Sequence, residues 1–84
     1  MLKLDLEFMR TYDKHPRSEK LLRHLVQAAL ELGIQPLQEG VETKEHFEFL
    51  KSIGCRYAQG YYFAKPLPIE KSREFTQSKG LEWE

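Results

Sequence analysis

A small set of polar residues carries most of the chemical potential of this sequence, in three short segments: Lys3 and Asp5, Glu39 and Glu42, and Gln59. A carboxylate at the end of a strand could bind a metal ion or act as a general base. A lysine adds a cation beside such groups, and an amide could hydrogen-bond to a ligand. Whether they form a site depends on the elements that position them.

Each of these residues also has an ordinary structural explanation. Glu39 directly precedes Gly40 at the end of an expected strand, where it points into a shared crevice or is an exposed loop acid. Lys3 would be a buried cation inside a barrel and a solvated side chain on an ordinary sheet, and Asp5 has the same ambiguity. Gln59 lies beside glycine and several aromatic residues, so this segment either approaches a ligand or belongs to the core. The pattern alone leaves these alternatives open.

The composition limits the classes of protein to which the chain can belong. Eighty-four residues allow one small domain, and 13 basic against 13 acidic residues give a formal net charge of zero. This balance argues against DNA or RNA polymers as partners. No apolar run approaches the ~20 residues of a membrane span. A single cysteine, Cys55, excludes an internal disulfide, and the first residues lack an apolar leader, so we expect a cytoplasmic protein.

Apolar periodicity and capping residues predict three helices. Leucine, valine and alanine recur with helical spacing over residues 19–32, where Ser18 fits the N-cap and Gly33 the end. Thr43 fits the N-cap of a second helix that ends at Gly54. A weaker third helix is predicted over residues 69–78, before Gly80.

Three strands are predicted between these helices, over residues 1–8, 34–38 and 56–63. The first strand shows alternation of leucines with charged residues. Pro36 belongs at the start or the edge of its strand, because it has no N–H to donate. The polar stretch 10–17 indicates a loop, and Pro66 and Pro68 are expected to close the third strand.

The order of these elements, a strand followed by a helix three times over, predicts an α/β fold. Such alternation implies parallel strands joined by right-handed crossovers. A parallel sheet needs cover on both faces, and three helices on one face leave the other bare. We therefore expect the chain to be incomplete, or to bury the bare face against another chain, as in a homo-oligomer.

Three segments taken together resemble the motifs of one family. Leu2–Asp5 is similar to K-x-D, Gln38–Thr43 to E-G-V-E-T, and Ala58–Pro68 to Q-G-Y-x-F-x-x-P-x-P of the EAL domain. That family comprises bacterial cyclic-di-GMP phosphodiesterases. The order and the intervening lengths also agree, across nearly the whole chain. The resemblance implies that residues 1–84 are the last three strand–helix units of a modified (β/α)8 barrel of the TIM type.

The resemblance also implies a role for each polar residue. Such phosphodiesterases hydrolyse cyclic di-GMP to linear pGpG with two Mg²⁺ or Mn²⁺ ions. Glu39 matches a glutamate that binds a metal or assists the attacking water, and Lys3 matches a lysine that contacts this water and the phosphate. Asp5 matches an aspartate that orients the lysine. Glu42 matches a glutamate that supports the site geometry, and Gln59 matches a glutamine that lines the substrate cleft.

Several parts of the family pattern have no counterpart in these 84 residues: the Glu-Ala-Leu signature, the metal-binding Asn, a further Glu and the Asp-Asp-Phe-Gly segment. Glu39 alone cannot complete a two-metal site, since hard cations need several oxygen ligands. Gln38 stands where the family has a small residue. We therefore expect a complete domain to bind cyclic di-GMP and the metal ions, and the isolated chain to be inactive. The alternative is a non-catalytic EAL-like receptor for cyclic di-GMP or a protein-interaction module.

Overall fold

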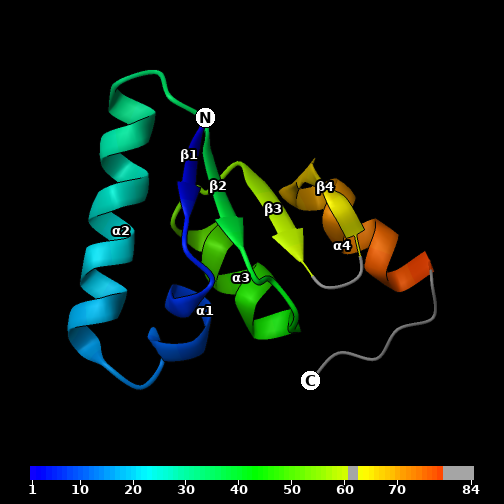
Figure 1. Cartoon of the computed structure of the whole chain (residues 1–84), viewed down its shortest axis with the longest axis horizontal. Coiled ribbons are helices and arrows are strands. Elements are labelled where there is room, and N and C mark those ends of the chain that lie inside the picture. Colours follow the sequence, from blue (N-terminus) through cyan, green and yellow to red (C-terminus); the bar gives the residue numbers. More distant parts are fainter. Residues whose placement is uncertain (61–62, 79–84) are drawn as a thin grey trace.

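The computed structural model describes residues 1–60 and 63–78 of the chain, and its architecture is α/β, as predicted (Figure 1). One four-stranded sheet has the order β1 (Leu2–Leu4), β2 (Pro36–Glu39), β3 (Tyr57–Gly60) and β4 (Phe63–Pro68). Four helices accompany it: α1 (Glu7–Thr11), α2 (Pro16–Glu31), α3 (Lys44–Ser52) and α4 (Ile69–Ser78). None of the helices in this part of the chain has the length and apolar character that crossing a membrane requires.

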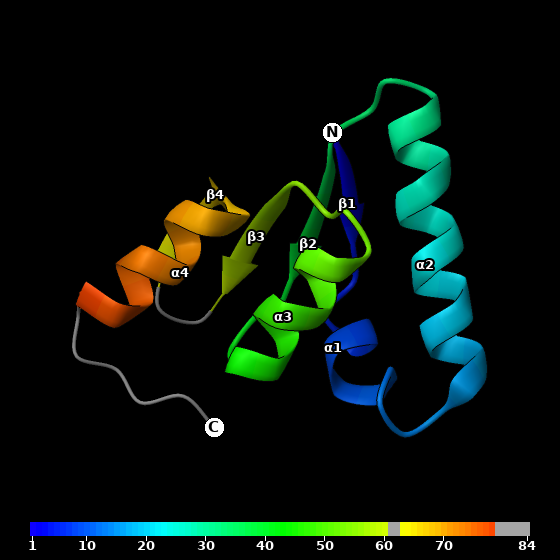
Figure 2. The ribbon, with the colours of Figure 1, turned by 180° about the vertical axis from the view of Figure 1, so that it is seen from behind.

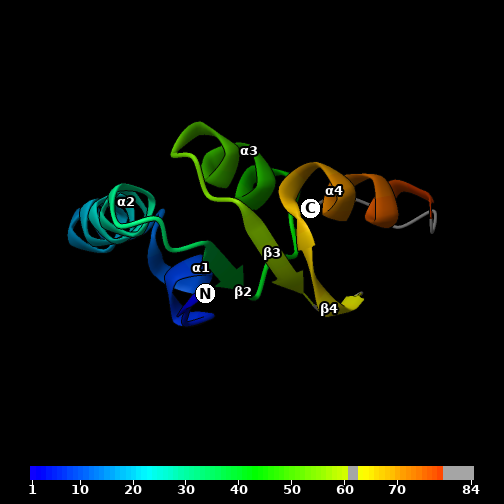
Figure 3. The same ribbon diagram turned by 90° about the horizontal axis from the view of Figure 1, so that it is seen from above.

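Strands β1, β2 and β3 are adjacent and parallel, as the sequence predicts. Helix α2 connects β1 to β2, and α3 connects β2 to β3. Seen from above, α2, α3 and α4 all lie on one face of the sheet (Figure 3). From behind, α3 and α4 stand in front of the strands (Figure 2). Within the described ranges, no helix lies over the opposite face, so that face of the sheet is open.

The apolar core lies between the sheet and its helices. Leu4 of β1 and Ala58 of β3 are 3% and 0% exposed, and both belong to a cluster with Val26 of α2 and Leu50 of α3. Burial of a leucine or valine side chain contributes about 1.5–3 kcal/mol. The core therefore fixes the helix-covered face of the sheet. The other face carries the polar side chains of Lys3 and Glu39 together with Leu37, which is 0% exposed.

Helix α2 begins earlier than predicted. It starts at Pro16, not after Ser18, and its N-cap is His15, which makes no side-chain capping bond. Proline suits the first helical position because its φ is already helical and it lacks the N–H that would be unpaired there. The predicted end is confirmed, since Gly33 has φ +73° and the Ile34 N–H donates to the Ala29 carbonyl over 2.8 Å.

The first predicted strand is too long, because the chain turns directly after β1. The Asp5 carboxylate accepts the Glu7 N–H at 2.9 Å, and α1 follows. Part of this helix, Arg10 and Thr11, falls in the stretch predicted as loop. An aspartate that binds the backbone two residues ahead is a turn signal, and here it outweighs the alternation of the leucines.

A fourth strand was not predicted, and it runs antiparallel to β3. Pro66 and Pro68 do not close the strand that precedes them but lie within β4. Proline is tolerated there because β4 lies at the edge of the sheet. The helix that follows, α4, has the predicted bounds. The predicted stop at Gly80 and the motif residues Tyr61 and Tyr62 lie outside the described residues.

Two further expectations about single residues are confirmed. Pro36 is the first residue of β2, where no ladder N–H is lost. Cys55 is 5% exposed, and burial raises the pKa of its thiol to about 11. Its sulfur donates towards the Pro36 and Tyr57 carbonyls. A thiol this hard to ionise is a packing residue and not a nucleophile.

Candidate functional site

The strand register places the polar residues on the open face of the sheet. The register aligns Lys3 of β1 with Leu37 of β2 and Tyr57 of β3. Two residues further along these strands, Glu39 is aligned with Gln59. Aligned residues of parallel strands point to the same side, and so do residues two apart in one strand. Lys3, Glu39 and Gln59 therefore share a face, opposite to the face of the core residues Leu4 and Ala58. Lys3 is exposed there.

A hollow of about 380 Å³ opens at the carboxyl ends of these strands. Three of the predicted site residues line it: Glu39, Glu42 and Gln59. Segments that are well separated in the sequence thus meet at one place, as the parallel order requires. Lys3 and Asp5 do not line this hollow; they lie next to it, in and directly after β1.

Gly40 brings two loops close together at the floor of the hollow. It has φ +76°, and a Cβ at this position would lie 2.7 Å from the Cβ of Leu6. The next residue, Val41, donates its N–H to the Gln59 carbonyl at 3.2 Å. The segment that links Glu39 to Glu42 is therefore held between the end of β3 and the turn after β1.

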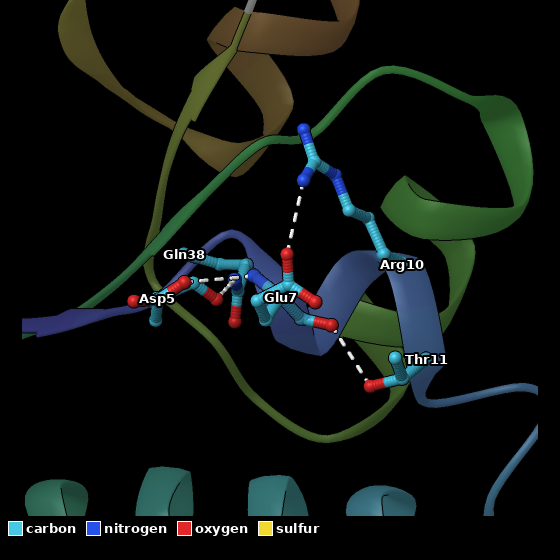
Figure 4. Close-up of polar contacts among 5 residues, drawn as sticks. All are labelled: Asp5, Glu7, Arg10, Thr11 and Gln38. Carbon is cyan, nitrogen blue, oxygen red and sulfur yellow. Dashed lines mark hydrogen bonds and ion pairs between the residues drawn. The ribbon is translucent and has the colours of Figure 1, made fainter.

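Helix α1 supplies two lining residues that the sequence did not predict, Leu6 just before it and Arg10 within it. Arg10 donates to the Glu7 carboxylate at 2.9 Å, and both side chains are largely exposed (Figure 4). The sequence signal that could have revealed them is the turn at Asp5, which starts α1. The Asp5 carboxylate is occupied by the Glu7 N–H, so its observed contact orients this helix.

Helix α3 begins next to Glu42 with a capping box. The Thr43 hydroxyl accepts the His46 N–H at 3.1 Å, which confirms Thr43 as the N-cap. In return, Nδ1 of His46 accepts the N–H groups of Glu42 and Thr43 at 3.1 and 3.3 Å. The same ring lies edge-on to Tyr12, which stacks on Phe49. This imidazole therefore anchors the loop that carries Glu42.

The histidine cap makes this loop sensitive to acid. Burial lowers the pKa of His46 from 6.5, and it outweighs the opposing effects of the Glu42, Asp13 and Glu45 carboxylates and a hydrogen bond with the Met9 backbone. The unfolded chain then binds the proton more tightly than the folded protein. As the pH falls below about 6.5, we expect the free energy of unfolding to decrease, because the protonated ring can no longer accept the two N–H groups. Urea unfolding at a series of pH values measures this decrease.

Two variants separate His46 from the other ionisable groups. Glutamine at this position completes a capping box without titrating. In His46→Gln, the free energy of unfolding should therefore decrease less on acidification than in the unmodified chain. His24→Gln, on the exposed side of α2, should leave it unchanged. An equal pH dependence in His46→Gln and the unmodified chain would rule out the assignment.

The carboxylates of the described residues do not by themselves make a metal centre. Glu39 and Glu42 line the hollow, but no group of three or more His, Cys, Asp or Glu residues in the described ranges could hold an ion. Hard divalent cations need six or more oxygen ligands, of which water supplies only some. Within the described ranges, the hollow thus offers two carboxylates, which are only part of the ligand set of a divalent cation.

Comparison with known proteins gives matches to one domain family. The family model of the EAL domain matches residues 1–66. The oxygen sensor protein DosP of Escherichia coli is 40% identical over 70 residues, which is 83% of this chain and 9% of that protein. The cyclic di-GMP phosphodiesterase RocR of Pseudomonas aeruginosa is 42% identical over 67 residues, 80% of this chain and 17% of that protein.

Solved structures share the fold of this chain. A standalone EAL protein from Vibrio cholerae, in its c-di-GMP-bound form, superposes with a TM-score of 0.64 and 38% identity, over 76% of this chain and 27% of that one. The chain thus spans less than a fifth of the length of the two curated relatives and about a quarter of this structure. The family match covers the first two motif segments and most of the third, and the chain belongs to the EAL domain family.

Proposed function

We propose that these residues form the carboxyl-terminal part of a domain that hydrolyses cyclic di-GMP to linear pGpG. The observation that carries the proposal is the meeting of Glu39, Glu42 and Gln59 at one hollow, on the face that also carries Lys3. Several relatives are phosphodiesterases of cyclic di-GMP by name, which supports the same reaction here.

Each residue of the chain has a distinct part in this proposal. Glu39 lies at the end of β2 and would accept a proton from, or hold, the water that attacks phosphorus. Lys3, on the same face, would stabilise the negative charge that develops on the phosphate. Gln59 would hydrogen-bond to the substrate in the cleft. Glu42 and Asp5 support the geometry, since Glu42 belongs to the capped start of α3 and Asp5 to the start of α1.

EAL phosphodiesterases use divalent metal ions, and we assign Mg²⁺ or Mn²⁺ to the complete domain. Glu39 is the metal ligand that this chain contributes. Because the described residues hold no complete ligand set, we expect no hydrolysis by the chain alone.

The open face of the sheet needs a cover, and we assign it to the remainder of an EAL barrel, present in the same protein or docked as a separate part. A second copy of the chain is the alternative cover. The cytoplasm suits such a domain, since its one cysteine is a buried thiol. The zero net charge gives no support for a nucleic-acid polymer as partner.

The experiment that tests this function completes the barrel. In a hybrid domain, the 67 residues of this chain that align with RocR replace the corresponding segment of RocR. We expect the hybrid domain to convert cyclic di-GMP to pGpG with Mg²⁺ or Mn²⁺, and the 84-residue chain alone to give no turnover. Liquid chromatography of the products measures both.

Two results would count against the proposal. A folded hybrid domain that binds cyclic di-GMP without hydrolysing it would indicate a receptor. Turnover by the isolated chain would mean that the missing ligands are not needed. Unmodified RocR serves as the positive control, and circular dichroism establishes that the hybrid domain is folded.

A further inference from the structure

Gln38 is a fully buried amide on the apolar side of the sheet. It is 0% exposed, and the register aligns it with Leu4 and Ala58, which belong to the core. A carboxamide in such a place is unfavourable unless it is hydrogen-bonded. Its bonds therefore indicate what the residue does.

The Gln38 amide donates to three backbone carbonyls from two strands. Its Nε2 lies 3.2 Å from the Leu4 oxygen, 2.9 Å from that of Asp5 and 2.8 Å from that of Glu39. Paired residues of β1 and β2 end at Leu4 and Gln38. The side chain thus continues the connection beyond the last backbone pair, where the strands lead into separate loops (Figure 4).

The other half of the same amide has no partner. Oε1 of Gln38 is buried and accepts no hydrogen bond within the described part of the chain. The reversed orientation would place this oxygen against three carbonyl oxygens, which is repulsive, so the donor side is fixed. An apolar side chain of the same shape would fill the space without an unpaired acceptor. Filling the core therefore does not account for glutamine, whereas joining the carbonyls does.

Both ends that the amide joins lead directly to the hollow. After Asp5, the chain turns into Leu6 and α1, which form one wall. After Glu39 comes Gly40, whose backbone lies against Leu6. We propose that Gln38 is a positioning residue, which fixes the separation of Asp5 and Glu39 and so sets the width of the hollow.

This inference rests on the proposed function for its kinetic test, and it uses the hybrid domain. Gln38→Met keeps the volume and removes the donors. Displacement of a reacting group by about 1 Å can lower a rate about 100-fold, so we expect kcat to fall about 10- to 100-fold with KM changed less than about threefold. Val26→Ala, a core change in α2 that removes no hydrogen bond, is the matched control for lost stability.

A second readout does not depend on activity. Hydrogen exchange followed by mass spectrometry should show the amides of residues 5–9 and 39–42 exchanging at least about 10-fold faster in Gln38→Met, and not in Val26→Ala. If the unmodified hybrid domain is inactive, the proposed function fails, and these exchange rates alone decide the role of Gln38. Unchanged kcat in an active domain, or equal effects of Val26→Ala, would overturn the inference.

Gln38→Leu keeps the test decisive if Gln38→Met does not fold. Leucine is an ordinary core side chain of similar size that lacks the donors. We expect the same fall in kcat and the same faster exchange of the amides of residues 5–9 and 39–42. Unchanged kcat and exchange in a folded Gln38→Leu hybrid domain would contradict a role for the donors.

Discussion

Glu39→Gln in the hybrid domain is expected to lower the kcat for cyclic di-GMP hydrolysis by about 10²- to 10⁴-fold, the usual contribution of a positioned acid or base. The amide has the shape of the carboxylate but neither takes up a proton nor offers a charged oxygen to a cation. Because Glu39 ends β2 on the open face, the change should leave the packing of the core intact. Initial rates with saturating Mn²⁺, and the urea midpoint of the same protein, measure the two effects separately.

The matched control for this prediction is Glu48→Gln. Glu48 is an exposed residue of α3 and does not line the hollow, so the same chemical change there should leave the rate within about twofold. Equal activity of Glu39→Gln and Glu48→Gln would show that the carboxylate at the end of β2 takes no part in the reaction.

Gly40→Ala is expected to destabilise the folded domain by about 2–5 kcal/mol. An alanine at φ +76° is strained by about 1–2 kcal/mol, and crowding in a packed site adds about 1–3 kcal/mol. Here the new methyl group would lie 2.7 Å from the Leu6 Cβ and 3.2 Å from its Cα, and neither atom can move without the backbone. Urea unfolding of the unmodified and altered proteins measures the difference.

Gly33→Ala separates the conformational strain at positive φ from the crowding against Leu6. Gly33 has nearly the same conformation, φ +73°, but no atom lies within 4 Å of a Cβ built there. We expect a loss of about 1–2 kcal/mol from conformation alone. If Gly40→Ala is no worse than Gly33→Ala, then the approach of Gly40 to Leu6 does not restrict the site.

Short-range signals in the sequence account for the parts of the fold that were predicted. Gly33 and Thr43 mark helix ends through bonds within a few residues, and the structure has both. The start of α2 was placed too late because Ser18 is a common cap, whereas Pro16 had the stronger preference. Strand β4 was missed because two prolines argue against a strand, and only its place at the sheet edge allows them.

Some residues of the candidate site were likewise predicted from the sequence, and others were missed. Glu39, Glu42 and Gln59 were predicted from motifs, and the parallel order brings them to one hollow. Arg10 was missed because its helix was not predicted. Gln38 was noted only as a departure from the family pattern, since its role depends on carbonyls more than 30 residues away in sequence. Long-range contacts of this kind leave no local pattern.

The buried sulfur of Cys55 allows transient opening of the folded protein to be measured. With a thiol pKa of about 11, only about a thousandth of the groups is ionised near pH 8, and the folded sheet shields even these from alkylating reagents. Labelling then proceeds through molecules in which the core around Cys55 has opened. Since these 84 residues contain no second cysteine that competes, the labelling rate of each variant measures how often this part of the core opens, without an engineered cysteine.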